Sequence, residues 1–279
     1  MPDQTFIVGD AGGTGTQWRV VNDGNIEQFE TIGFNAFTHS IADLKSSIAD
    51  VFLKGIKKDT PLFFYAAGAD TTQQCTEIAS SLSSLFGNRV IVKNDLLGVA
   101  RSLCGKEKGN VCILGTGANA CYYNGEEVNK VSASLGYVLG DEGSGAYLGK
   151  KLLQGVFRKY FSDEVIHLFH DQYSLTPHDA IQKLYTAHKP NQFLASFAPF
   201  IHEHRHHQDM FRLIKSSFED FFDGFFRNNT SDLPFHFSGS IAYHFSEILR
   251  EVGNERGFYI KNIVKSPISG LVLYHQKYE

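Results

Sequence analysis

Two acidic residues of this sequence stand at the ends of short apolar runs, where a strand would give way to a loop or helix. Asp10 follows TFIVG, and Asp95 follows RVIVKN. In α/β folds, the carboxyl ends of strands are where catalytic groups collect. At such a position Asp10 could hold Mg²⁺ directly or through water, and Asp95 is a candidate catalytic group. Asp95 is equally suited to capping the helix that follows it.

Two segments rich in glycine and threonine have the composition of phosphate-binding loops, because bare backbone N–H groups can surround phosphate oxygens. A hairpin without a ligand is the alternative. No GxxxxGK motif with a following Ser or Thr occurs, so neither segment is a P-loop. The second segment fits GxGxxA, but strand-like CYYNG follows where a dinucleotide site needs a helix. The segments are Asp10, Gly12, Gly13, Thr14, Gly15 and Thr16, and then Gly115, Thr116, Gly117 and Asn119.

Three further segments have chemical potential. GDEGSG, which contains Asp141, could bind sugar hydroxyls or metal-bound water, or only begin a helix. Gly239, Ser240 and Ala242 form a turn that would let a flat ring or a ribose approach closely. HEHRH over residues 202–206 satisfies HExxH, the pattern of a zinc hydrolase, with Glu219 as a loose third ligand. Four histidines crowd this region, however, and a solvated, histidine-rich helix end accounts for them equally well.

The surrounding elements follow from periodicity. TFIVG, QWRVV and IEQFETI, with a turn at residues 22–25, predict three antiparallel strands. Helices are expected over residues 40–56 and 75–86, with the strands LFFYAAG and RVIVKND between and after them. The order of strand, Gly/Thr loop, strand and turn recurs at NVCILGTGANACYYNG, which suggests two related α/β domains. A row of phenylalanines over residues 211–226 predicts a core helix or an oligomer interface.

Composition narrows the class of protein. The chain has 279 residues, a net charge of −4, and 42% hydrophobic residues. A chain of this size can form a hydrophobic core without disulfide bonds or structural metal ions. It lacks the excess of positive charge by which proteins bind nucleic acid or an anionic membrane. No apolar run approaches 18 residues, no signal peptide is evident, and the four cysteines form no CxxC pair. A cytoplasmic enzyme with free thiols is expected.

The order of these motifs carries a resemblance. DAGGTGTQW, KND, LGTGAN, LGDEGSG and SGSIA resemble the N-acetylglucosamine kinase branch of the BadF/BadG/BcrA/BcrD ATPase family. The resemblance implies two ribonuclease-H-like domains of the actin/Hsp70 ATPase type with an interdomain cleft. We expect one domain over residues 1–105 and the other over 106–266, with a last helix over about 267–279 packing back on the first.

The resemblance also implies an ATP-dependent kinase for an amino sugar, most simply the 6-hydroxyl of N-acetylglucosamine, with ATP and Mg²⁺ as cofactors and a homodimer as the assembly. It implies that Asp95 is the general base, that Asp10 holds Mg²⁺, and that Asn35, Asn94, Asn119, Gly136 and Asp141 bind the sugar. The nucleotide would contact both Gly/Thr segments and the turn at Gly239, Ser240 and Ala242.

Two departures from the family pattern concern the site. Gly15 stands where a Lys is frequent, so one positive contact near the phosphates is expected to be absent. Leu135 stands where animal members have Trp, which leaves the exact sugar open but not the ATP site. N-acetylmuramic acid and glucosamine are the alternative substrates. A different class is also open, because the family includes ATPases that activate 2-hydroxyacyl-CoA dehydratases and benzoyl-CoA reductases through an iron–sulfur cluster held by cysteines. A sugar or nucleotide sensor without catalysis is the remaining alternative, although it would not need Asp95.

Overall fold

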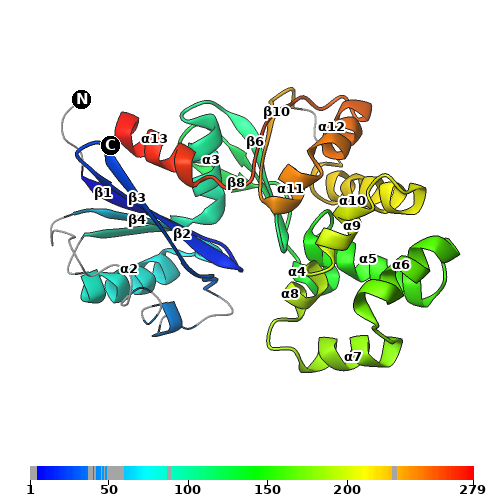
Figure 1. Cartoon of the computed structure of the whole chain (residues 1–279). Helices are drawn as coiled ribbons and strands as arrows, with labels where there is room; N and C mark the ends of the chain where they lie inside the picture. The colour runs from blue at the N-terminus through cyan, green and yellow to red at the C-terminus, as the bar shows by residue number, and fades with distance from the viewer. Residues whose placement is uncertain are drawn as a thin grey trace. The chain divides into compact units, whose positions relative to one another are not determined.

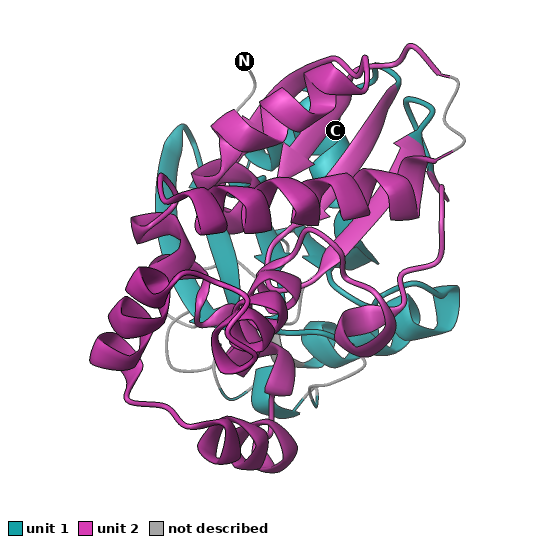
Figure 2. Cartoon of the chain, turned by 90° about the vertical axis from the view of Figure 1, so that its right-hand side faces the viewer, with its two compact units in different colours: residues 1–108, 123–128, 266–279 teal, residues 109–122, 129–265 magenta. Residues whose placement is uncertain are grey.

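The computed structural model describes residues 5–36, 40, 42–44, 46, 48, 60–86, 89–227 and 231–279. The chain forms two compact units (Figure 2). Unit 1 contains residues 1–108, 123–128 and 266–279, and unit 2 contains residues 109–122 and 129–265. Among the described residues, no helix combines the length and apolar character needed to span a bilayer.

A five-stranded mixed sheet, in the order β3-β2-β1-β4-β5, is the centre of unit 1. The first three strands form the predicted antiparallel meander, whereas β4 and β5 run parallel to β1. The parallel strands β1, β4 and β5 therefore end at one edge of the sheet. The strands are β1 (Phe6–Ala11), β2 (Gly15–Asn22), β3 (Asn25–Ile32), β4 (Leu62–Ala66) and β5 (Val90–Asn94).

Alternating side chains give the sheet of unit 1 two apolar faces. Helices α2 (Thr72–Phe86), α3 (Asp95–Cys104) and α13 (Ile268–Tyr278) belong to the same unit, and α13 lies beside α3 (Figure 1). One face packs with α2, through Ile7, Trp18, Phe64, Ile78 and Leu82. The opposite face packs with α13, through Phe6, Val8, Tyr65, Leu271 and Val272.

The helix expected over residues 40–56 lies largely outside the described residues. At its start, the Ser40 hydroxyl accepts a hydrogen bond from the Asp43 backbone N–H at 3.2 Å, as a helix cap does. Leu44 and Ile48 are fully buried, in agreement with their places in the apolar pattern.

Unit 2 has a second five-stranded sheet in the order β10-β9-β6-β7-β8. Strands β6, β9 and β10 are parallel. Read from the other edge, the order matches that of unit 1, which agrees with the repeat seen in the sequence and confirms the two-domain α/β class. The strands are β6 (Gly109–Leu114), β7 (Ala118–Tyr123), β8 (Val128–Lys130), β9 (Phe235–Ser238) and β10 (Ile260–Val264).

The helices of unit 2 cover this sheet and extend beyond it. The phenylalanine-rich helix α10 is a core helix, because Phe221 and Phe222 are buried and pack against Phe237 and Phe235 of β9. The apolar face that suggested a dimer is thus covered within unit 2. The helices are α4 (Gly136–Leu139), α5 (Gly145–Phe157), α6 (Asp163–Tyr173), α7 (Pro177–Thr186), α8 (Pro190–Ala195), α9 (Ala198–Glu203), α10 (Gln208–Phe226), α11 (Ser240–His244) and α12 (Ser246–Glu255).

Candidate active site

The first Gly/Thr segment is a tight hairpin between β1 and β2 in unit 1. The Gly12 N–H donates to the Gly15 carbonyl at 3.1 Å, and the Gly12 carbonyl accepts from the Phe34 N–H at 3.0 Å. The hairpin is also tied to the end of β4, because the Ala67 N–H donates to the Ala11 carbonyl at 3.0 Å. These backbone hydrogen bonds from neighbouring segments therefore hold the loop in one conformation, although it is rich in glycine.

The surface that this hairpin presents is formed by Gly12, Thr14 and Gly15, which are exposed. Thr16 is fully buried, and its hydroxyl donates to the Ile32 carbonyl at 2.8 Å. Behind the loop, a Cβ on Gly33 would lie only 2.6 Å from backbone atoms of Gly13. A glycine is needed there because two backbone segments touch. The sequence analysis missed Gly33, although a glycine directly after a strand is the kind of signal that could have indicated it.

Asp10 is the second-to-last residue of β1 and has an unusually high proton affinity for a carboxylate. It pairs with Tyr65 in β4 and with Gln17 in β2, so it belongs to the sheet. Burial, and secondly the negative charge of Asp95, raise the pKa of Asp10 from 3.8 to about 7. The two carboxylates therefore influence each other's charge at the carboxyl edge of the unit 1 sheet. A bound cation would favour the ionised form of Asp10.

Asp95 is the first residue of α3, and the cap of that helix comes from its neighbour. The Asn94 side-chain oxygen accepts from the Leu96 N–H at 2.8 Å, while its amide nitrogen donates to Asp70. Asp95 also accepts from the Leu96 N–H, through one carboxylate oxygen at 2.8 Å. A carboxylate can accept several hydrogen bonds, so the bond from Leu96 does not by itself occupy all of Asp95.

Two more residues meet at this edge. Asn35 forms a parallel bridge with Ala67, and the Ala36 N–H donates to the Ala67 carbonyl at 2.9 Å. Asp70 follows the same stretch and binds Asn94. The sequence analysis missed Asp70, although an acidic residue after the strand LFFYA and the glycine of AAGAD is the same kind of signal that singled out Asp95.

In unit 2, the second Gly/Thr segment is a hairpin between β6 and β7 on which helix α5 begins. The Gly115 N–H donates to the Gly117 carbonyl at 3.0 Å. The carbonyls of Gly115 and Thr116 accept from the N–H groups of Gly145 and Ala146, at 2.8 and 3.0 Å. The hairpin and the first turn of α5 thus form one connected piece. Like the first hairpin, this one leads into a strand, so the dinucleotide motif lacks its helix.

Asp141 lies against this second hairpin. It has a left-handed φ of 59°, and a carboxylate oxygen accepts from the Ala118 N–H at 3.3 Å. Burial raises the pKa of Asp141, and the hydrogen bond from Ala118 acts in the opposite direction. The next position of the strand, Asn119, is partly buried and accepts from the Ala120 N–H at 3.0 Å. Gly136 is the first residue of α4, and two residues before it the Ser134 hydroxyl donates to the Ala118 carbonyl at 3.4 Å.

The Gly239 turn joins the same edge of the unit 2 sheet. Gly239 has φ 120°, and a Cβ there would lie 2.2 Å from the Leu114 carbonyl oxygen. Only glycine fits a turn with both constraints. Ser240 is exposed at the start of α11, whereas Ala242 is fully buried in the core of unit 2.

The structure therefore collects the candidate residues into two groups, one in each unit. The unit 1 group contains Asp10, Gly12, Gly13, Thr14, Gly15, Thr16, Asn35, Asn94 and Asp95. The unit 2 group contains Gly115, Thr116, Gly117, Asn119, Asp141, Gly239 and Ser240; in the same unit, Gly136 begins α4 and Ala242 is buried in α11.

Among the described residues of this chain, neither metal-site alternative has a set of ligands. Helix α9 ends at Glu203, and residues 204–206 form a turn, so the HExxH residues do not share one helix. The four cysteines are free: Cys75 and Cys104 belong to unit 1, and Cys112 and Cys121 to unit 2. Within the described ranges, no group of three or more His, Cys, Asp or Glu side chains could hold a metal ion.

Comparison with known proteins places this geometry in a family. No family model matches the chain. A solved structure from Porphyromonas gingivalis, assigned as an N-acetylglucosamine kinase, is 35% identical with TM-score 0.92, covering 98% of this chain and 99% of that one. A second structure with the same assignment, from Chromobacterium violaceum, is 19% identical with TM-score 0.76, covering 98% and 99%, and shows the shared fold.

One curated protein adds a sequence match. The N-acetylmuramic acid/N-acetylglucosamine kinase of Clostridium acetobutylicum is 32% identical over 96 residues, which are 34% of this chain. The match spans about a third of that relative's length, 31%. The 35% identity to the Porphyromonas protein extends over nearly its full length. It confirms the resemblance that the motifs indicated: the chain belongs to the N-acetylglucosamine kinase-like family.

Proposed function

We propose that this protein is an ATP-dependent sugar kinase that phosphorylates an amino sugar, with the 6-hydroxyl of N-acetylglucosamine as the acceptor. The supporting observation is the 35% identity to the Porphyromonas protein over almost the whole chain, combined with a carboxylate, Asp95, at the junction of β5 and α3. The name of the curated relative supports the same class of substrate.

Asp95 would act as the general base. A sugar hydroxyl is a weak nucleophile at neutral pH. Asp95 would accept its proton while the oxygen forms a bond to the γ-phosphorus of ATP and the bond from phosphorus to the ADP oxygen breaks. General base catalysis contributes about 10²–10⁴-fold to such a step. The remaining acceleration would come from positioning and from stabilisation of the phosphoryl charge.

The nucleotide phosphates would lie against the two Gly/Thr hairpins and the adenosine against the Gly239 turn. Thr14 is the exposed hydroxyl of the first hairpin, so it would contact the phosphates, while Thr16 supports the loop from below. Gly115, Thr116 and Gly117 would serve in the second hairpin, and Ser240 would face the adenosine.

Mg²⁺ fits this donor set. Magnesium is usually held by one or two carboxylates together with substrate phosphates and water. Asp10 offers such a carboxylate at the sheet edge, and the described residues contain no all-protein metal cage. Bound there, magnesium would neutralise phosphate charge as it builds up during transfer. The role of Asp10 in this proposal is to hold the ion, directly or through water.

The sugar would be held by side-chain amides and by Asp141. Asn35, Asn94 and Asn119 offer both donors and acceptors for ring hydroxyls and the acetamido group, and Asp141 offers a carboxylate anchored on Ala118. Leu135, beside Gly136, is 55% exposed. N-acetylmuramic acid, which the name of the curated relative includes, and glucosamine remain the competing substrates within this class.

The test is an ADP-release assay with Mg-ATP and a panel of N-acetylglucosamine, N-acetylmuramic acid, glucosamine, N-acetylmannosamine and glucose. The wild type, Asp95→Asn and Asp23→Asn are compared. Asp23 is an exposed residue of the β2–β3 turn, so Asp23→Asn is the matched control. We expect turnover with an acetylated amino sugar, a loss of ~10²-fold or more in Asp95→Asn, and no change in the control. Folded protein that binds ATP but releases no sugar-dependent ADP would refute the kinase proposal.

A further inference from the structure

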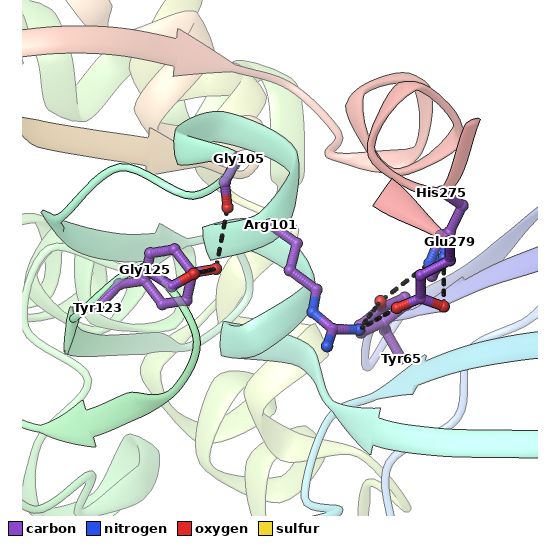
Figure 3. A network of polar contacts seen from close by, with 7 residues as sticks. All are labelled: Tyr65, Arg101, Gly105, Tyr123, Gly125, His275 and Glu279. Carbon is purple, nitrogen blue, oxygen red and sulfur yellow. Dashed lines mark hydrogen bonds and ion pairs between the residues drawn. The ribbon is translucent and has the colours of Figure 1, made fainter. Parts of the chain in front are cut away.

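A closed ring of polar contacts lies in unit 1 (Figure 3). We call it the Arg101 network; it consists of Tyr65, Arg101, His275 and Glu279. An Arg101 terminal nitrogen donates to the Tyr65 hydroxyl at 2.8 Å. That hydroxyl lies 3.0 Å from His275 Nε2, and His275 Nδ1 lies 3.2 Å from Glu279 Oε2. Glu279 Oε1 lies 3.6 Å from the same Arg101 nitrogen, which closes the ring.

One arrangement of hydrogens gives every contact of the ring a donor and an acceptor. Arg101 donates to Tyr65, Tyr65 donates to His275 Nε2, and His275 Nδ1–H donates to Glu279. This arrangement requires a neutral imidazole and a protonated phenol. Burial, with a smaller effect of Arg101, lowers the pKa of His275 to about 3, and burial raises the pKa of Tyr65 to about 12. Both groups therefore have the required state at neutral pH, and their nearly complete burial makes any lost contact costly.

The ring connects three elements, one of which carries Asp95. Arg101 lies on α3, Tyr65 on β4, and His275 on α13. Two close approaches lie beside the ring. The backbone of Gly98 packs against the Tyr65 ring, where a Cβ would be 2.8 Å from ring carbons, and Gly270 packs against Ser102, where a Cβ would be 2.2 Å from the hydroxyl.

The second half of α3 is further fixed at its end. The Ser102 hydroxyl donates to the Pro267 carbonyl at 2.8 Å. The Tyr123 hydroxyl lies 2.9 Å from the carbonyl of Gly105, the cap residue of α3, and 2.8 Å from that of Gly125 (Figure 3). Contacts from β4, from α13 and from the segment around Tyr123 thus converge on the last turns of a helix whose first residue is Asp95.

We infer that the Arg101 network is a positioning device for Asp95, in which α13 and β4 fix where α3 lies along its own axis. Asp95 precedes Arg101 by six residues, or ~9 Å along the helix, and a helix transmits such a displacement as a rigid rod. A misplacement of about 1 Å far from the reacting atoms can cost ~10²-fold in rate. The inference rests on the proposed function, because it assigns Asp95 the role of base.

Tyr65→Phe tests the network with little change of shape, since it removes only the hydroxyl that links Arg101 to His275. Leu273→Ser is the matched control, because Leu273 lies on α13 but is 66% exposed. With kcat referred to folded protein, we expect Tyr65→Phe to lower kcat roughly 3- to 10-fold, with the KM for ATP changed less than twofold and the control unchanged. Glu279→Gln should also lower kcat, by a smaller factor than Tyr65→Phe.

A double-mutant cycle separates positioning from simple loss of stability. If Tyr65 acts through Asp95, Tyr65→Phe should have no further effect on the residual rate of Asp95→Asn. A structural role alone would lower the rate by the same factor in both backgrounds, and that result would overturn the inference. An unchanged kcat in Tyr65→Phe would overturn it as well.

A readout without turnover distinguishes failure of this inference from failure of the proposed function. The Leu96 N–H donates to an Asp95 carboxylate oxygen at 2.8 Å, so its NMR chemical shift reports where that carboxylate lies. We expect Tyr65→Phe to shift the Leu96 amide signal, and Leu273→Ser to leave it unchanged. A wild type without sugar kinase activity refutes the function alone, whereas a Leu96 signal identical in wild type and Tyr65→Phe refutes the positioning role.

Discussion

Asp10 has a proton affinity that costs the folded protein stability. Its pKa is raised to about 7, whereas its ordinary value is 3.8. Between those two pH values the folded chain keeps a proton that the unfolded chain has released. The free energy of unfolding therefore falls as pH rises from about 4 to about 7, and above pH 7 the whole cost is present. Such a cost is typical of a residue kept for function rather than for folding.

Asp10→Asn removes this cost, because an amide does not ionise. At about 1.4 kcal/mol per unit of pKa shift, we expect the variant to be more stable than the wild type by up to about 4 kcal/mol at pH 8. At pH 4 the two proteins should have nearly the same free energy of unfolding. Asp10→Asn should have lost its sugar kinase activity. Urea unfolding at both pH values measures the difference, and Asp23→Asn serves as control. A variant that is less stable than the wild type at pH 8 would contradict the raised pKa.

On helix α13, His275 makes a contribution to the free energy of unfolding whose dependence on pH is opposite to that of Asp10. His275 is neutral in the fold, with its pKa lowered to about 3. It packs on the Phe63 ring, with centroids 3.8 Å apart, and its polar neighbours are Tyr65, Arg101 and Glu279. In the unfolded chain a histidine gains a proton below about pH 6.5. The stabilisation from the neutral imidazole is therefore complete above that value and is lost progressively as pH falls toward 3.

We expect this single group to lower the free energy of unfolding by about 2 kcal/mol between pH 7 and pH 5. His275→Gln keeps one donor and one acceptor but does not titrate. The variant should therefore be less stable at pH 7, yet lose less stability on acidification. Asp10 contributes the same change in stability to the wild type and to His275→Gln, opposite in sign to the change from His275. The difference between the two proteins therefore isolates His275. Chemical unfolding monitored by the α13 amides in NMR measures both slopes, and parallel slopes would show that His275 does not titrate as described.

At the scale of the molecule, unit 1 is built from three separate stretches of chain. Residues 266–279 supply Ile268, Leu271 and Val272, which cover the face of the sheet formed by Phe6, Val8 and Tyr65. A chain ending at Lys265 should therefore leave that face open to water and lose the cooperative unfolding of unit 1. Adding a peptide of residues 266–279 should restore it, whereas a scrambled peptide should not. Near-UV circular dichroism and hydrogen exchange of the β1 amides measure the recovery, and an unaltered β1 in the shortened chain would contradict the expectation.

The parts of this molecule that local sequence could predict are those built within one short segment. The two hairpins, the strands β1 and β5, and the buried face of α10 each follow from a pattern of a few residues. Local patterns did not separate the roles of neighbours: Asn94, not Asp95, is the cap of α3. The HExxH match failed because a helix end, set by packing, falls inside it.

Long-range contacts were beyond such patterns. Tyr65 meets Arg101 across 36 residues and His275 across 210, and Gly33 matters only because Gly13 folds onto it. Nothing in the local composition around Arg101 or His275 distinguishes a buried member of the Arg101 network from a charged side chain exposed to solvent. Only the topology, which brings α13 beside α3, creates the need for those side chains.

The division of unit 1 among distant stretches also has a consequence during synthesis. After residue 108 leaves the ribosome, 157 further residues, 109–265, are made before Ser266. At about 5–20 residues per second this takes roughly 8–30 s. Through that interval the nascent sheet keeps an apolar face open, long after its own strands have emerged. The first half of this chain therefore has reason to be a client of chaperones that bind nascent polypeptides, and codon changes that slow translation of residues 109–265 should lower its soluble yield.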